Sequence, residues 1–248
     1  MRVANGVEML EISAIIMGKV NVIHPMLLWD EDVVILVDTG YPGQLPLFRE
    51  AMAKAGVPFD RLSKVIVTHQ DLDHIGNLPV ILNESPRRVE VLAHEVEKPY
   101  IQGEKRLLKI TPQAIAQALN SLPPEMPEQQ RKAFKAALEN PPKANVDKTV
   151  ADEEELPYCG GITVITTPGH TPGHISLYHK KSKTLITGDA LLVVNGQLHR
   201  PHPHSTLDMN LAINSLKKLT QYDIETVICY HGGLYKGDAN QRIAELAL

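Results

Sequence analysis

The stretch Val65-Ile66-Val67-Thr68-His69-Gln70-Asp71-Leu72-Asp73-His74 leads from four β-favouring residues directly into four side chains that can bind a metal ion. The first four residues predict a buried strand, so the candidate ligands His69, Asp71, Asp73 and His74 stand at its end. Open α/β sheets bind their ligands outside the carboxyl ends of their strands. We therefore expect an α/β fold with a metal site at one edge of a sheet.

Length and composition are those of an ordinary globular protein. The 248 residues suffice for one large α/β domain or two small ones. A hydrophobic content of 43% with 22% charged residues argues against disorder. The net charge of −4 provides no broad attraction to nucleic acid or to an anionic membrane. We expect neither as a partner and a small molecule as substrate.

Three features predict a cytoplasmic protein. Cys159 and Cys229 are too few for a disulfide framework and lack the CxxC spacing of a structural zinc site. Residues 1–10 carry charges at Arg2 and Glu8 and contain no apolar core typical of a secretion signal. No later apolar run approaches the roughly 20 residues that a membrane helix needs.

Short β-branched runs predict strands in both halves of the chain. Residues 12–17, 20–23 and 33–37 indicate an antiparallel sheet with turns at Gly18-Lys19 and at 30–32. Further strands are predicted over 88–93, 162–165, 175–179, 184–187 and 226–229. Two sheets with helices outside them accommodate this order of elements.

Apolar residues at helical spacing predict helices over 45–55, 76–82 and 208–219, the second interrupted at Pro79. The region 95–155 also has helical spacing, but prolines divide it into short pieces. We interpret it as a helical insertion that covers one face of a single domain formed by residues 1–248. Three roles are open for it: a lid over the metal site, the surface of a possible homodimer, or plain packing.

Three later segments also place a histidine or an aspartate directly after a predicted strand. They are Gly169-His170, Gly188-Asp189 and Tyr230-His231. Strands that end at the same edge of a sheet bring such side chains to one point. Together with the loop 69–74, these segments predict a metal site built from four strand ends.

This set of motifs resembles the metallo-β-lactamase superfamily. Five elements occur in the order of that family: Asp38-Thr39-Gly40, the loop 69–74, Gly169-His170, Gly188-Asp189 and His231. The resemblance covers nearly the whole chain, with the insertion as its least matched part. It implies a four-layer αβ/βα sandwich with a dinuclear metal site between the two sheets.

The resemblance also implies the ligands. One metal ion would be held by His69, Asp71 and His170, and the other by Asp73, His74 and His231, with Asp189 bridging both. The family usually has histidine at the position of Asp71, so this chain has an HxDxDH variant of the motif. Direct coordination by Asp71, coordination through water and a weakly held first metal are all open. A third carboxylate shifts the preference from zinc, the family's usual metal, towards manganese or iron.

The activity implied by the resemblance is metal-dependent hydrolysis of a small ester, lactone or thioester by a hydroxide bound to the two metals. Asp73 is the candidate catalytic residue that orients the hydroxide and passes its proton to the leaving group. Lactonases of the family have a tyrosine shortly after the bridging aspartate, and residues 190–193 contain none.

Two other functions are open. A carboxylate-rich di-iron oxidoreductase is one, because iron-containing relatives also have a carboxylate, although a glutamate, at the position of Asp71. A non-catalytic metal-binding protein of the same fold is the other. Among the remaining histidines, His174 is expected to support the loop of His170. The histidines of the segment 199–204 either line the mouth of the site or belong to an exposed linker: His199, His202 and His204.

Overall fold

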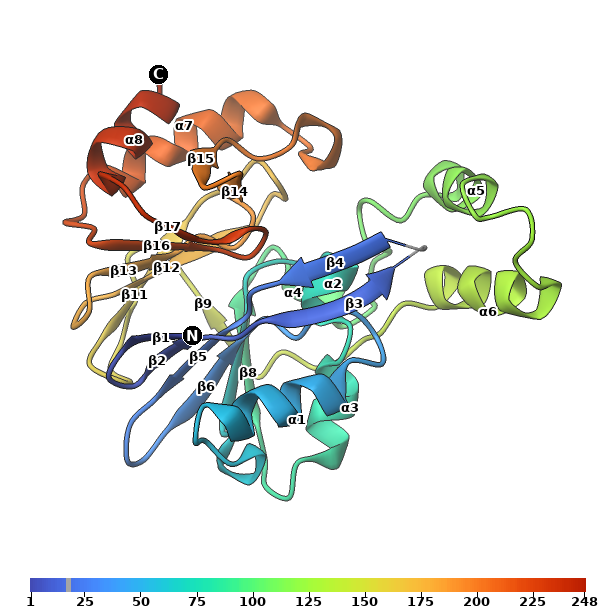
Figure 1. Ribbon diagram of the computed structural model, residues 1–248, viewed down its shortest axis with the longest axis horizontal. Coiled ribbons are helices and arrows are strands. Elements are labelled where there is room, and N and C mark those ends of the chain that lie inside the picture. The colour runs from blue at the N-terminus through green and yellow to red at the C-terminus, as the bar shows by residue number, and fades with distance from the viewer. Residues whose placement is uncertain (17–18) are drawn as a thin grey trace.

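Two β-sheets form the centre of the computed structural model, which describes residues 1–16 and 19–248 (Figure 1). The first sheet has the strand order β1-β2-β5-β6-β7-β8-β9. Its strands are β1 (Arg2–Ala4), β2 (Val7–Met9), β5 (Met26–Trp29), β6 (Val34–Val37), β7 (Lys64–Val67), β8 (Glu90–His94) and β9 (Lys148–Val150). β6 to β9 run parallel. β6 is buried at all four positions, as expected for a parallel strand covered on both faces.

The second sheet has the order β10-β11-β12-β13-β16-β17. Its strands are β10 (Glu155–Leu156), β11 (Ile162–Thr166), β12 (Ile175–His179), β13 (Thr184–Ile186), β16 (Thr226–Cys229) and β17 (Gly233–Tyr235). β13 and β16 are parallel, and the other pairs are antiparallel. The strands predicted over 162–165, 175–179, 184–187 and 226–229 are therefore confirmed to within a residue.

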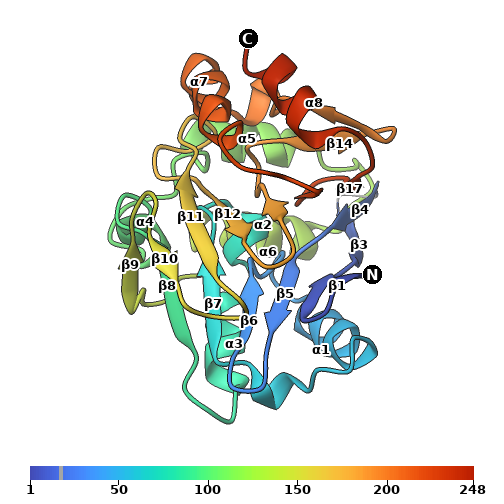
Figure 2. The same ribbon diagram turned by 90° about the vertical axis from the view of Figure 1, so that its left-hand side faces the viewer.

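Helices cover the outer face of each sheet (Figures 1 and 2). Between the sheets, side chains such as Ile66 and Leu92 share one buried apolar cluster with Val164 and Ile228. On the first sheet's outer face lie α1 (Leu45–Lys54) and α3 (Leu78–Glu84), and on the second sheet's lie α7 (Met209–Leu219) and α8 (Ala239–Leu246). This arrangement confirms the predicted four-layer αβ/βα sandwich.

The N-terminal strands differ from the prediction. β3 (Ile12–Ile16) and β4 (Lys19–Ile23) pair with each other in a separate two-stranded sheet, whereas one sheet with residues 33–37 was expected. The reason is that β2 pairs with β5, a strand that was not predicted, and this pairing leaves the intervening β3 and β4 outside the sheet. Gly18 of the turn predicted at Gly18-Lys19 lies outside the described residues.

The helix predicted over 76–82 is also corrected. The structure has two short helices here, α2 (Leu72–Ile75) and α3, and Pro79 lies in the first turn of α3 instead of interrupting a helix. Proline is tolerated at that position because the first backbone N–H groups of a helix have no acceptor within the helix.

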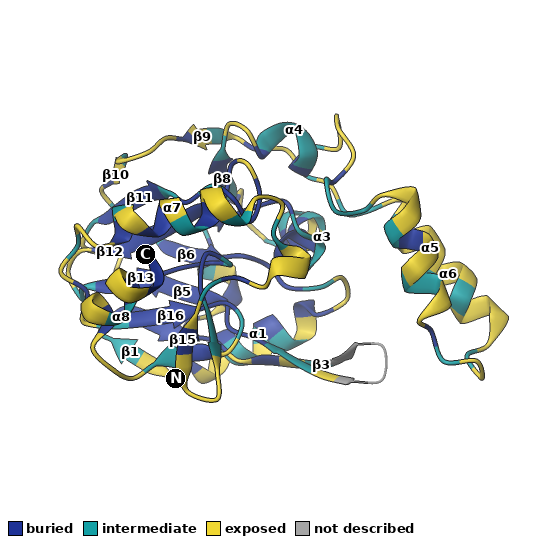
Figure 3. Ribbon diagram, turned by 90° about the horizontal axis from the view of Figure 1, so that it is seen from above, coloured by how far each residue is buried: buried dark blue, intermediate teal, exposed yellow. Residues whose placement is uncertain are grey.

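The region 95–155 contains three helices, α4 (Lys98–Ile101), α5 (Pro112–Asn120) and α6 (Glu128–Glu139), together with β9 of the first sheet. α5 and α6 extend away from the sheets and are largely exposed (Figures 1 and 3). The remaining elements are β14 (Leu192–Val194), β15 (Gln197–His199) and the 3-10 helices η1 (Phe59–Arg61) and η2 (Pro203–Ser205). Among the described residues, no helix has the length and apolar character needed to cross a membrane.

Candidate metal centre

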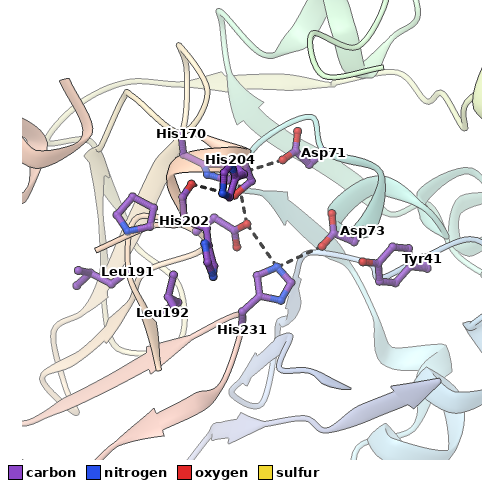
Figure 4. A pocket seen from close by; sticks show the side chains of 12 residues that line it. Tyr41, Asp71, Asp73, His170, Leu191, Leu192, His202, His204 and His231 are labelled. Atoms are coloured by element: carbon purple, nitrogen blue, oxygen red, sulfur yellow. Dashed lines mark hydrogen bonds and ion pairs between the residues drawn. The ribbon is translucent and has the colours of Figure 1, made fainter. Parts of the chain in front are cut away.

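The four predicted strand ends meet at one edge of the sandwich (Figure 4). The loop after β7 carries His69 and Asp71, and α2, which follows it, carries Asp73 and His74. The loops after β11, β13 and β16 carry one candidate ligand each. The structure brings all seven into two clusters in which the ligand atoms lie within 4.8 Å of one another. The Asp71 cluster consists of His69, Asp71, His170 and Asp189, and the Asp73 cluster of Asp73, His74 and His231.

Asp71 reaches the centre despite its short side chain. Its Oδ2 lies 3.2 Å from His69 Nε2 and 3.1 Å from His170 Nε2. The carboxylate therefore points to the same position as the two imidazoles. A cation at this position would meet two nitrogen donors and one oxygen donor.

Asp189 lies between the two clusters. Its Oδ2 is 3.3 Å from His170 Nε2 and 3.4 Å from His231 Nε2, and its Oδ1 is 3.4 Å from His74 Nε2. In the Asp73 cluster, Asp73 Oδ2 lies 3.2 Å from His231 Nε2. Asp189 is thus placed to face two cations at once.

The donor set fits divalent metal ions. Three buried atoms of the ligand side chains lack a hydrogen-bond partner within the described part of the chain: His69 Nε2, His74 Nε2 and Asp189 Oδ1. Such orphaned atoms are uncommon in native proteins and point to a partner such as an ion. Imidazole nitrogens and carboxylate oxygens are ligands for zinc, manganese and iron.

The electrostatics of the centre also favour cations. Burial opposes ionisation of Asp71 and Asp189, but the neighbouring imidazoles hold the pKa of both carboxyl groups well below their usual range. Burial lowers the pKa of His231, but Asp189 and Asp73 outweigh this effect and raise it to about 10. In the metal-free protein, protonated imidazoles therefore balance part of the negative charge, and metal binding must release such protons.

Asp38 orients the His74 ring by contacting Nδ1, the ring nitrogen on the far side from the Asp73 cluster. Asp38 Oδ2 lies 2.9 Å from His74 Nδ1, and both oxygens accept hydrogen bonds from Thr68, each at 2.8 Å. With Nδ1–H donating to Asp38, Nε2 of His74 faces the cluster. Asp38 adopts φ +64°, a left-handed conformation that is uncommon for residues other than glycine. The Asp38-Thr39-Gly40 motif thus acts through His74.

His174 is buried and supports the loops, as expected. Its Nε2 accepts a hydrogen bond from the Asp189 backbone N–H at 3.0 Å, and its Nδ1 lies 2.8 Å from Thr167 Oγ1. Both ring nitrogens are therefore engaged away from the metal clusters.

A buried glutamate that the sequence did not indicate joins two ligand loops. Glu97 is 0% exposed. Its Oε2 accepts hydrogen bonds from Gln70 N at 3.0 Å and Gln70 Nε2 at 2.8 Å. Its Oε1 accepts one from Gly173 N at 2.7 Å. Glu97 therefore connects the loop of His69 to the loop of His170, although no spacing pattern marks it.

Lys109 is a second residue that the sequence did not indicate. It lies between α4 and α5, and its Nζ is 2.5 Å from Asp71 Oδ2 and 2.7 Å from His170 Nε2. The sequence around Lys109 has no motif or spacing that would predict these contacts.

A cavity of about 420 Å³ opens above the ligands. Besides ligand residues it is lined by Tyr41, Leu191, Leu192, Pro201, His202, His204 and Ser205. His202 and His204 thus lie at the site, whereas His199 belongs to β15 and is exposed.

The hydroxyl of Tyr41 points towards Asp73 (Figure 4). Burial, Asp73 and Asp189 raise the pKa of Tyr41, so its hydroxyl stays protonated and can donate a hydrogen bond.

Comparisons with known proteins agree with the fold and identify the family. Residues 19–231 match the family described as the Metallo-beta-lactamase superfamily. The probable metallo-hydrolase YflN of Bacillus subtilis (strain 168) is 28% identical over 215 residues, which cover 80% of this chain and 75% of that protein. A hydroxyacylglutathione hydrolase of Chelativorans sp. (strain BNC1) is 40% identical over 82 residues, 33% of this chain and 29% of that protein. The crystal structure of the metallo-beta-lactamase family protein TTHA1429 from Thermus thermophilus superposes with a TM-score of 0.69 at 23% identity, covering 99% of this chain and 79% of that one.

Proposed function

Because this chain belongs to the metallo-β-lactamase superfamily and is a metallo-hydrolase of that superfamily, we propose that it hydrolyses a small ester, lactone or thioester with the help of two divalent metal ions. The observation that carries the proposal is the convergence of seven ligand side chains beside a cavity, with three buried ligand atoms that lack a partner among the described residues.

One ion would be held by the Asp71 cluster and the other by the Asp73 cluster, with Asp189 facing both. Zinc is the usual metal of the family, and the additional carboxylate of Asp71 favours manganese or iron as alternatives. Bound divalent ions lower the pKa of water from about 15.7 to about 7 and thereby supply hydroxide at neutral pH.

The chain's own side chains have separate tasks in this reaction. Asp73 lines the cavity, where its carboxylate orients the nucleophile, accepts the proton and passes it to the leaving group. Tyr41 lines the same cavity and offers a neutral O–H donor to an oxygen that becomes negative during the reaction. Tyr41 supplies a hydroxyl that the segment after Asp189 lacks, which keeps lactones among the candidate substrates.

The cavity supports a small substrate. Its volume of about 420 Å³ lies in the range typical of small-molecule sites. Leu191, Leu192 and Pro201 provide an apolar wall, and His202 and His204 provide polar groups. Similarity to a hydroxyacylglutathione hydrolase over part of the chain supports thioesters as one candidate class. The two buried, unpaired thiols, Cys159 and Cys229, support a reducing cytoplasm as its location.

The test is metal analysis of protein purified from its own cells, followed by turnover assays on esters, lactones, thioesters and phosphodiesters. Asp189→Asn should lower both metal content and kcat/KM, the latter by about a hundredfold or more. Asp60→Asn is the control, because it removes the same charge at an exposed position. Wild-type protein without bound metal and without metal-stimulated turnover would refute the proposal, and normal turnover by Asp189→Asn would refute the bridging role.

A further inference from the structure

Lys109 places a positive charge inside the candidate metal centre. Its Nζ lies 2.5 Å from Asp71 Oδ2 and 2.7 Å from His170 Nε2, two of the four ligands in the Asp71 cluster. The side chains of Lys109 and Asp71 are only 21% and 15% exposed. The lysine thus approaches the position that a metal ion would need.

The backbone beside Lys109 is anchored on the loop that carries Asp71. The Leu108 N–H donates a hydrogen bond of 2.8 Å to Gln70 Oε1. Gln70 in turn donates from its backbone and side chain to the buried carboxylate of Glu97. Since these polar groups are paired in a buried network, the position of Lys109 is built into the fold.

The contact with His170 excludes a metal ion at the same atom. An ammonium group can only donate hydrogen bonds, so the 2.7 Å contact engages the lone pair of His170 Nε2 when that nitrogen is unprotonated. His170 Nδ1 lies 3.4 Å from Thr206 Oγ1. A neutral imidazole has one lone pair on its unprotonated nitrogen, and a metal ion needs that same lone pair. Lys109 must therefore move before His170 can bind a metal.

The Asp73 cluster contains no competing lysine or arginine among the described residues. Ion pairs of Asp73 are formed with His74 and His231, and those of Asp189 with histidines alone. Lysine and arginine side chains do not pair with either carboxylate in this part of the chain. The two halves of the centre therefore differ in whether a lysine contacts the ligand atoms.

We propose that Lys109 is an internal cation that takes the place of a metal ion in the Asp71 cluster and must withdraw before that cluster is loaded. The inference rests on the proposed function, because it presupposes that both clusters bind divalent ions. The centre then fills in order: the Asp73 cluster binds its ion first, and the Asp71 cluster binds the second ion more weakly. At low metal concentration the protein carries one ion and one ammonium group.

The test is calorimetric titration of metal-free protein with Zn²⁺, with bound zinc counted by elemental analysis. The wild type should bind two ions, the second at least about tenfold more weakly. Lys109→Met should tighten the second site by about tenfold or more, since the charge-assisted hydrogen bonds no longer have to be broken. The control Lys105→Met removes the same charge from an exposed position four residues earlier and should behave as wild type.

Labelling of wild-type lysines with an acylating reagent, read by mass spectrometry, tests the movement without a variant. Lys109 should react faster in zinc-saturated than in metal-free protein, and equal labelling would overturn the inference. Two zinc sites with the same affinities in wild type and Lys109→Met would also overturn it, while leaving the proposed function standing. A wild type that binds no zinc, manganese or iron would overturn the proposed function itself.

Discussion

Replacing Glu97 by glutamine should separate the two loops that carry most of the candidate ligands. The buried carboxylate accepts two hydrogen bonds from Gln70 and one from Gly173 N at 2.7 Å. Gln70 follows His69 directly, and Gly173 lies in the loop of His170. In Glu97→Gln, the amide oxygen can keep both bonds to Gln70. The amide NH₂ group then faces the N–H of Gly173, donor against donor.

The magnitude follows from these contacts. One charge-assisted hydrogen bond is lost, and one buried N–H is left without an acceptor. Together these changes should lower the free energy of unfolding by about 3 kcal/mol. For a chain of this length, that loss corresponds to a decrease in Tm of about 6 to 12 °C. Zinc affinity should fall as well, because the loops of His69 and His170 are no longer held at a fixed separation.

The assay is reversible urea unfolding of metal-free protein, together with a zinc titration of the folded variant. Glu95→Gln is the matched control, because it changes the same chemical group at an exposed position two residues away. The control should stay within about 0.5 kcal/mol of wild type. If Glu97→Gln were as stable as Glu95→Gln and bound zinc equally well, Glu97 would not hold the loops together.

Two further substitutions test individual roles in the centre. Tyr41→Phe removes a hydrogen-bond donor at the cavity wall and should lower kcat/KM by about a hundredfold without changing the metal content. Steady-state kinetics and metal analysis check this prediction. Unaltered kinetics would exclude Tyr41 as a donor. Asp71→His replaces a carboxylate by an imidazole and should shift the ratio of bound zinc to bound manganese towards zinc in a competition measurement. An unchanged ratio would show that Asp71 is not a ligand.

Much of the fold was predictable because its signals are local. The strand before His69 could be identified from four consecutive β-favouring residues, and the helix predicted over 208–219 from apolar spacing. The order of motifs then indicated the four-layer sandwich. The pairing of β2 with β5 was not predicted. These two strands are separated in the sequence by β3 and β4, and which strands pair across such a segment depends on which edge of the sheet is free.

The sequence by itself determined which side chains can bind metal and that they follow strands, since both depend on residue type and short spacing. Only the tertiary structure decided what surrounds those side chains. Glu97 and Gly173 are separated by 76 residues, and Lys109 and His170 by 61. Such contacts have no periodic signal, because they arise when two sheets pack and bring unrelated loops to one edge. The carboxylate that joins the loops and the lysine that faces Asp71 are therefore properties of the packed protein.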